Sequence, residues 1–544
     1  MNILRKCIIF LCLLAANFPA CANEENAEFV SYEKFGAKGD GKTDDQLAIA
    51  AAHDFANSAD LPVKVKNNAT YYIGGGKRVI NIMTDTDFGT ARFIIDDRKV
   101  KDRRKPVFAV KSRLKSYSLK GLTSLYKHQT KLPVQLKERA LVQLNNGRIR
   151  RFIRYGVNAN KGTTQNDIII VNKDGSIDKS TPLVWDFEVI TSNIARPIDQ
   201  EQLVIKGGVF TTIANAEPGA HQYYARNMQI TRSNVLVSGL VHKVIEPKVP
   251  HSFPYSGFIT ISGCCNVTVQ DCVLTGRKVY KTVKPNSRST STGTYDISVR
   301  CSANIKFINC SQTNDILDRQ YWGIMGSNFC KNLEYDRCKL SRFDAHCGVY
   351  NATIRNSILR TISVTGFGNL LVENSTVYAR DFIVLRQDYG SFWNGDITIR
   401  NCTQIPPGSS SNIPNVIGGR HIAEHFFGYT CVMPQNILID GLNVRDNRHP
   451  RKYSGPALLA NFNRNYLQNK KYSEPYPTVK PRQITVRKFV TASGKRFILS
   501  SNKNMFKKVK LIDEDKKQRA RERGKMQKDM QNSNRSGKKA SGKK

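Results

Sequence analysis

The sequence predicts an all-β protein, a right-handed parallel β-helix (solenoid) with an N-terminal capping helix and a β-rich insertion. The main observation is a short phrase that recurs about nine times, which is typical of repeats that must stack to close a core. Each copy alternates apolar and polar positions, the period-two pattern of a strand with one buried face. The copies are Asn266–Cys272, Asn304–Cys310, Asn332–Cys338, Asn351–Ser357, Asn369–Ser375 and Asp396–Cys402, with looser ones at Gln202–Gly208, Asn234–Leu240 and Asn436–Leu442.

The N-terminal part of the chain predicts a helix that covers one end of the coil. Before it, Gly36–Thr43 satisfies the pattern of a nucleotide-binding P-loop, but Asp40, Asp44 and Asp45 crowd the segment with negative charge, which argues against a phosphate cradle. We predict instead a glycine-rich turn and a helix capped by Thr43, Asp44 or Asp45. Its buried side is expected to contain Leu47, Ile49, Ala50, Ala51 and Phe55.

The segment Phe35–Asp45 (FGAKGDGKTDD) and the alanine-rich helix after it resemble the N-terminal segment of the pectate-lyase-like superfamily of right-handed β-helices, in its bacterial, exported, polysaccharide-degrading type. The resemblance implies a helix over the open end of the coil. It specifies no reaction, because that superfamily includes lyases, hydrolases, epimerases and phage tailspikes.

The chain is predicted to be an exported solenoid. Residues 1–22 have the features of a signal peptide, with Arg5 and Lys6 before a short apolar run and a small-x-small site at Ala20–Ala22; Cys21 is an alternative lipidation site. We therefore expect the protein in the periplasm, on the cell surface or outside the cell, with no transmembrane segment. The expected segments are the cap helix and first coils (23–96, with strands at Val63–Lys66 and Thr70–Ile73), a basic β-rich insertion or subdomain (97–198), regular coils with a groove (199–447), C-terminal coils with an irregular segment (448–506, with strands at Gln483–Arg487 and Arg496–Ser500) and a disordered basic tail (507–544).

Cysteines recur at one position of the phrase. That position is in phase with the apolar strand positions and should point inward. A stacked column of small buried residues explains it better than metal ligation or catalysis, and the chain contains no Cys-x-x-Cys pair. The members of this column are Cys272, Cys310, Cys338 and Cys402, with Ser357 and Ser375.

The formal net charge of +40 indicates a polyanionic partner. Part of the charge lies in the tail, and a second dense basic stretch runs from Arg98 to Arg154. Because the chain is predicted to be exported, an acidic polysaccharide, lipopolysaccharide or anionic cell surface is favoured over nucleic acid. We expect a monomer.

The spacing of the phrase predicts where a groove lies. Copies 351 and 369 are close together, so they form a floor, and the longer intervals on both sides provide walls. Ionisable and aromatic residues follow the strands of these adjacent coils. The catalytic candidates are His346, Arg360, Arg380, Asp344 and Tyr350, and the substrate-binding candidates are Lys278, Asn314, Asp315, Arg319, Tyr321, Trp322, Arg386 and Tyr389.

Resemblance to the polygalacturonases, which share the coil, implies that Asp344 lies where their first catalytic aspartate falls. The chain departs from their pattern, with Thr313-Asn-Asp in place of Asn-Thr-Asp and no second aspartate beside Asp344. Glycoside hydrolysis needs a pair of carboxylates. Asp344 has three alternative roles: an arginine partner, an orienter of His346, or a Ca²⁺ ligand with Asp315 or Asp381.

Uronate β-elimination requires cations that neutralise the sugar carboxylate, a base, and an acid for the leaving oxygen. Arg360, Arg380, His346, Tyr350 and Lys278 provide these residue types. We therefore predict a polysaccharide lyase that acts on a uronate-containing acidic polysaccharide, with a glycosaminoglycan favoured over pectin because of the charge. The alternatives are a polygalacturonase-type hydrolase in the same groove and a non-catalytic glycan-binding or adhesin β-helix.

Overall fold

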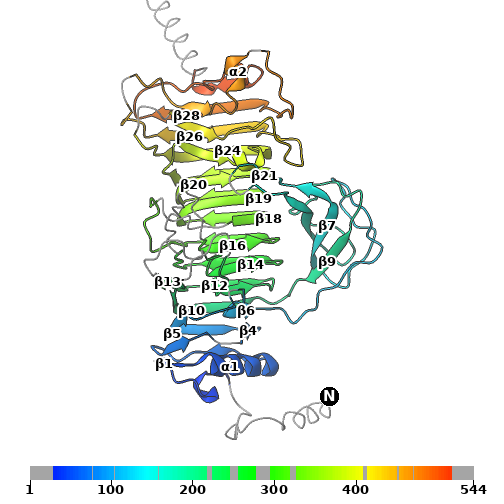
Figure 1. Cartoon of the computed structure of the whole chain (residues 1–544), viewed down its shortest axis with the longest axis vertical. Coiled ribbons are helices and arrows are strands. Elements are labelled where there is room, and N and C mark those ends of the chain that lie inside the picture. The colour runs from blue at the N-terminus through cyan, green and yellow to red at the C-terminus, as the bar shows by residue number, and fades with distance from the viewer. Residues whose placement is uncertain are drawn as a thin grey trace, which may run out of the picture.

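The chain winds into an elongated parallel β-helix, and an insertion projects from one side of it (Figure 1). The computed structural model describes residues 28–75, 78–102, 104–156, 159–216, 223–245, 255–276, 295–318, 326–408, 413–449, 452–469 and 471–516. The predicted signal peptide and residues 517–544 lie outside the described residues. The predicted all-β, right-handed β-helix is confirmed.

The coil has three faces, which we call sheets I, II and III in the order in which the chain passes through them. Sheet I contains the repeated phrase, and the strands confined to it are β2 (Val63–Lys64), β12 (Val235–Ser238), β15 (Cys265–Gln270), β17 (Ala303–Ile308), β21 (Gly366–Glu373) and β29 (Lys510–Asp513). Sheet II follows it, and its own strands are β1 (Asp40–Asp44), β3 (Thr70–Ile73), β13 (Val241–Ile245) and β22 (Thr376–Val377).

Sheet III closes each turn of the coil. Its strands are β4 (Ile80–Ile82), β6 (Phe108–Val110), β11 (Met228–Ile230), β14 (Ile259–Ser262), β16 (Ile297–Arg300), β23 (Asp381–Leu385), β25 (Asn415–Gly418) and β27 (Ala457–Leu459). The longer strands cross a corner and belong to more than one face: β5 (Thr86–Asp96), β10 (Leu203–Ile213), β18 (Gly326–Asp336), β19 (Lys339–Arg355), β20 (Ile358–Val364), β24 (Trp393–Gln404), β26 (Asn436–Val444) and β28 (Gln483–Thr491). The short helices are η1 (Glu33–Phe35), η2 (Gln387–Tyr389) and α2 (Asn465–Gln468).

Asparagines recur at the start of the phrase because the chain turns a corner there. Asn266, Asn304 and Asn351 have φ angles of 57°, 57° and 58°, in the left-handed region that asparagine tolerates better than most residues. Their side chains also bond from coil to coil: the Asn304 amide donates to the Asn266 side-chain oxygen at 3.0 Å. We call the stacked set the asparagine column; it consists of Asn234, Asn266, Asn304, Asn332, Asn351 and Asn369.

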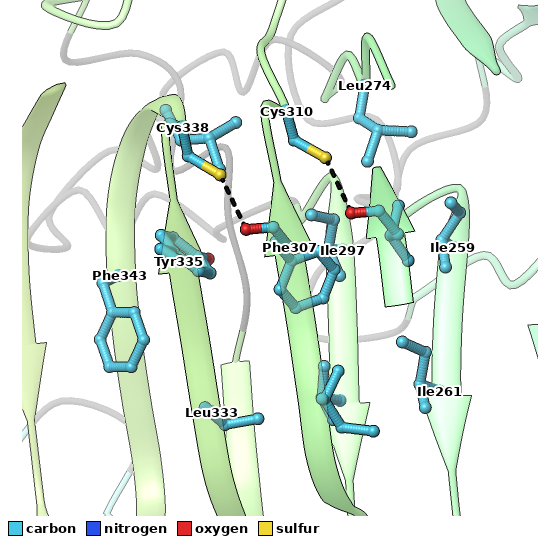
Figure 2. Close-up of a cluster of buried hydrophobic side chains, with 14 of the residues drawn as sticks. Ile259, Ile261, Leu274, Ile297, Phe307, Cys310, Leu333, Tyr335, Cys338 and Phe343 are labelled. Carbon is cyan, nitrogen blue, oxygen red and sulfur yellow. Dashed lines mark hydrogen bonds between the residues drawn. The ribbon is translucent and has the colours of Figure 1, made fainter. Parts of the chain in front are cut away.

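The predicted column of inward-pointing cysteines and serines is confirmed. The Cys310 and Cys338 thiols donate to the backbone oxygens of Val269 and Phe307, each at 3.3 Å (Figure 2). Where serine replaces cysteine, the Ser357 hydroxyl accepts a hydrogen bond from the Cys338 amide at 3.0 Å. All ten described cysteines are free and buried, so the column serves packing and backbone bonding.

The predicted cap helix is α1 (Gln46–Ala59), at the N-terminal end of the coil (Figure 1). Its predicted buried side is partly wrong, because Leu47 is 65% exposed and Ala51 is only half-buried. Asp45 is the N-cap residue, but its carboxylate accepts from the amides of Lys38 and Gly39 instead of capping the helix. The face that contacts the coil contains Gln46, Ile49, Ala50, Ala52, His53 and Ala56.

The loop that matched the P-loop pattern uses its amides internally. Asp40 accepts hydrogen bonds from the Lys42 and Thr43 amides, at 2.9 and 2.8 Å, and Asp45 occupies two more amides. The donors that a phosphate would need are therefore engaged by the chain's own carboxylates.

The insertion contains a three-stranded antiparallel sheet, in the order β8 (Thr163–Val171), β7 (Ala140–Arg151), β9 (Ser192–Pro197). The boundary predicted at residue 97 is wrong, because β6 pairs with β4 and β11 and belongs to the coil. Below, the insertion means residues 111–198. The predicted tail also starts too early, since β29 pairs in parallel with β28 and extends the coil beyond residue 507.

The insertion packs along the corner between sheets III and I. Its apolar side chains share a buried cluster with Phe367, Phe392 and Tyr429 of the coil. A buried ion pair between Asp167 of β8 and Lys331 of β18 crosses this contact at 2.8 Å, and the two side chains are 3% and 2% exposed. Outward-facing residues at this corner of the coil are thereby covered.

Candidate functional site

A pocket of about 1000 Å³ lies on the outer face of sheet III, beside the insertion. Its lining contains five arginines and two aspartates, so we call it the basic pocket. One wall comes from the insertion and the floor from β20, β23 and the loops that follow β23 and β25. The charged lining residues are Arg154, Arg342, Arg380, Arg386, Arg420, Asp381 and Asp388.

A chain of ion pairs organises the buried side of this pocket. Arg386 donates to Asp344 at 2.6 Å, and Arg342 reaches the other oxygen of Asp344 at 3.0 Å. Arg386 also forms two hydrogen bonds with Asp388, which pairs with Arg154 of the insertion at 2.9 Å. Burial by itself would raise the pKa of Asp388, but Arg386 and then Arg154 hold that pKa below its ordinary value. The predicted role of Asp344 as an arginine partner is confirmed.

The geometry does not fit a calcium ion at Asp344. Both carboxylate oxygens of Asp344 face arginines, and Asp381 is engaged by Arg380 at 2.6 Å and by the Asn415 amide at 2.6 Å. Calcium requires several oxygen ligands that are free to converge on it. Among the described residues, no group of three or more His, Cys, Asp or Glu side chains is arranged to hold a metal ion.

His346 lies beside the ion pairs and is largely covered. The Tyr389 hydroxyl is 3.4 Å from each ring nitrogen, and Asn328 Oδ1 is 3.3 Å from Nδ1. Burial first, and then the charge of nearby arginines, Arg386 foremost, lowers the pKa of His346 well below its ordinary value of 6.5. The imidazole is therefore neutral at pH 7, the protonation state that a general base requires, and the same shift makes it a weaker base than a solvated histidine.

The structure separates the predicted catalytic residues. Arg380, Asp344 and His346 lie on or next to the basic pocket, but Arg360 lies at the sheet II part of β20 and does not line it. Tyr350 lies just before the Asn351 corner of β19, packed against the insertion, where its ring is 5.7 Å from the Lys331 ammonium group. His346, Arg360 and Arg380 therefore do not all face one groove, because β20 bends from sheet II into sheet III beyond Arg360.

The predicted binding residues also divide. Arg386 and Tyr389 belong to the site: Arg386 lines the basic pocket and Tyr389 bonds His346. The Asn314 amide donates to the Gly276 oxygen of the preceding coil, and Asp315 accepts from the Leu317 amide in its own turn; neither residue lines the pocket. The remaining candidates, Lys278, Arg319, Tyr321 and Trp322, lie outside the described residues.

The site contains three arginines that were not among the predicted candidates: Arg154, Arg342 and Arg420. Arg154 belongs to the dense basic stretch noted in the sequence, but no local pattern places the insertion over sheet III. Arg420 follows β25 at the position that Arg386 occupies after β23. Aligning the sequence on the sheet III strands, and not on the repeated phrase of sheet I, would therefore have identified Arg420. Among the described residues, the Arg420 side chain forms no ion pair within 4.0 Å and is exposed. It is available to a ligand.

No protein-family model and no curated protein matches the chain. The tailspike gp61 of Pseudomonas phage phi297 aligns with 89% of this chain and 84% of its own, at 11% identity and a TM-score of 0.52. The tailspike protein gp49 of Pseudomonas phage LKA1 has the same coverage, 13% identity and a TM-score of 0.52. At such identities the likeness shows the shared β-helix fold alone. Within the described residues, no helix has the length and apolar character needed to cross a membrane.

Proposed function

We propose that the protein is an exported lyase of the pectate-lyase-like superfamily that cleaves a uronate-containing acidic polysaccharide, with a glycosaminoglycan favoured. The observation that carries the proposal is the basic pocket, in which five arginines outnumber two aspartates. The net charge of +40 supports it, because such a field concentrates polyanions around the molecule. If the chain is exported, the mature protein should begin near Asn23, which mass spectrometry checks. We also expect a monomer, which analytical sedimentation checks.

The side chains around the pocket supply the groups that β-elimination requires. The reaction removes the proton from the sugar carbon next to the carboxylate, breaks the bond to the glycosidic oxygen and forms a carbon–carbon double bond. Arg420, with no ion partner among the described residues, neutralises the substrate carboxylate and stabilises the charge that develops on it. Neutral His346 takes the proton, Tyr389 orients its ring, and water protonates the leaving oxygen.

Hydrolysis in the same pocket is less well supported. A hydrolase needs one carboxylic acid that stays protonated until it reaches the leaving group. Asp388 is unsuited to that role because its pKa is lowered, and both oxygens of Asp344 are bonded to arginines.

The test is incubation of the full mature chain with chondroitin sulfate, heparan sulfate, alginate and polygalacturonate. A rise in the ultraviolet absorbance of unsaturated uronate with at least one of them is the expected result. No rise with any of the four contradicts the proposal. New reducing ends without that absorbance would indicate a hydrolase, and binding without either product would indicate an adhesin.

Variants then assign the roles. His346→Gln should lower kcat at least about a hundredfold, the usual contribution of a general base. Arg420→Ala should mainly raise KM, about tenfold or more, because it removes one charge-assisted contact with the substrate. Arg355→Ala, an arginine of sheet I outside the pocket, is the matched control and should leave both constants unchanged. If His346→Gln keeps full kcat, the base lies elsewhere.

A further inference from the structure

A second groove, with a volume of about 740 Å³, lies on the outer face of sheet I and shares no lining residue with the basic pocket. Two parallel rows of side chains line it. The first row is Gln202 followed by the asparagine column. The second row, which we call the outer row, consists of Thr268, Lys306, Glu334, Thr353 and Leu371.

The groove runs along the axis of the coil. Thr268, Lys306 and Glu334 are successive register partners, and the pairing continues from Glu334 through Thr353 to Leu371. Strand partners in neighbouring coils are about 4.8 Å apart, so both rows repeat at that interval. The surface therefore presents similar groups at a regular spacing over consecutive coils.

The lining has hydrogen-bonding capacity and balanced charge. An asparagine amide has two donor hydrogens and an acceptor oxygen. Along the column, Asn266, Asn304 and Asn351 each use one amide hydrogen in the bonds between described residues, which leaves a second donor at those three coils. Asn332 uses both, because it donates to Asn304 and to the Ser180 oxygen of the insertion. The charges in the lining offset each other, because Lys306 lies 3.8 Å from Glu334.

We propose that this groove binds a linear, uncharged, hydroxyl-rich glycan strand that lies along the coil axis. Sugar hydroxyls both donate and accept hydrogen bonds, as the amide and threonine groups of the lining do. A polymer of repeating units matches a surface that repeats from coil to coil. An anionic chain is directed instead to the basic pocket, since the groove offers it no net positive charge. The assignment does not depend on a lyase activity.

Affinity electrophoresis of the full mature chain in gels that contain dextran, galactomannan or xylan tests the groove. Thr353→Trp places a bulky ring in the outer row, one coil before its end at Leu371, and Thr398→Trp is the matched control. Thr398 is the register partner of Leu371 in the next coil, is half-buried like Thr353, and lies outside the lining. Tryptophan is well tolerated at such strand positions, and thermal unfolding checks that both variants fold.

At least one of the three polysaccharides should retard both the wild type and Thr398→Trp. Thr353→Trp should raise the dissociation constant for that polysaccharide at least about tenfold. Raising the salt concentration should not change this retardation, because no net charge is involved. The proposal is overturned if none of the three polysaccharides retards the wild type. It is also overturned if Thr353→Trp is retarded as strongly as the wild type. Turnover of acidic polysaccharides by Thr353→Trp should stay at the wild-type level, so failure of the lyase proposal is seen separately.

Discussion

The basic pocket and the groove on sheet I are built on two faces of one coil, but the chain assembles them differently. Both rows of the groove come from the repeat, one residue per coil, and need only the register of parallel strands. The basic pocket combines Arg154 of the insertion with Arg386 and Arg420, which follow sheet III strands, and buries ion pairs beneath them. Periodicity alone therefore makes a uniform polar surface, whereas concentrated charge requires residues from outside the repeat.

The largest loss of stability should appear in the basic pocket, when a buried charge loses its partner. Asp344→Ala leaves Arg386 and Arg342 without that carboxylate, and the Arg386 side chain is only 8% exposed. We expect the apparent free energy of unfolding to fall by about 3–5 kcal/mol, as for other broken buried pairs. Denaturation in guanidinium chloride measures it. A loss below about 1 kcal/mol would mean that water reaches the ion pairs.

An intermediate loss of stability is expected in the groove, when an asparagine at a corner of the coil is replaced. Asn304→Ala places alanine at a φ of 57° and removes two side-chain bonds within the asparagine column. The strain and the lost bonds together should reduce stability by about 2–3 kcal/mol. Asn304→Gly is the control, because glycine accepts this φ; it should lose only about 1 kcal/mol. Equal losses in the two variants would contradict the role assigned to the backbone conformation.

Lowering the pH should reduce stability at the basic pocket more than at the groove on sheet I, by a smaller amount than the two substitutions above. The pKa of His346 is lower in the folded than in the unfolded protein, so the unfolded state takes up a proton first as pH falls below about 6.5. The contribution of His346 is thus complete above that pH and lost below it, by up to about 1.4 kcal/mol per pH unit.

Melting temperatures at pH 7.5, 6 and 5 measure this contribution. His346→Gln should show a shallower decline than the wild type, and Thr353→Trp in the groove should follow the wild type. His53 and His242, whose pKa values burial lowers to about 3, titrate equally in all three proteins and cancel. An unchanged slope in His346→Gln would show that His346 is solvated in the folded state.

The smallest effect is expected for the ion pairs of the groove. Glu334 pairs with Arg355 at 2.9 Å and with Lys306 at 3.8 Å, and the arginine and lysine side chains are 39% and 53% exposed. Glu334→Ala should change the free energy of unfolding by about 1 kcal/mol or less, and high salt should reduce the difference further. It serves as the matched comparison for Asp344→Ala. A loss above about 2 kcal/mol would show that sheet I depends on this carboxylate.

The sequence predicted the coil well because its information is local. A strand period of two decides which side chains point inward, so the phrase located the column of Cys310 and Cys338. The asparagines were recognised as a repeat, but their reason, the left-handed corner, required backbone angles. Leu47 was misplaced because helical period alone does not decide which side of α1 the coil covers.

The candidate site was predicted in part. The basic pocket does lie beside the short coils around residue 351, and Asp344 and Arg386 do meet. Arg360 was grouped with them because the number of residues after the sheet I phrase was used to align the coils. That number does not show where β20 bends from sheet II into sheet III. Positions within one sheet are predictable from the repeat; positions across a corner are not.

The amino-acid sequence by itself determined the β-helix, its inward columns and the positive charge, because these follow from alternation, small residues and composition. Only the tertiary structure decided which outward side chains stay accessible. The insertion covers Tyr350 and brings Arg154 to Asp388 through contacts such as Asp167 with Lys331, between residues far apart in the chain. Such long-range packing depends on the fit of two folded surfaces, and no local pattern of residues records it.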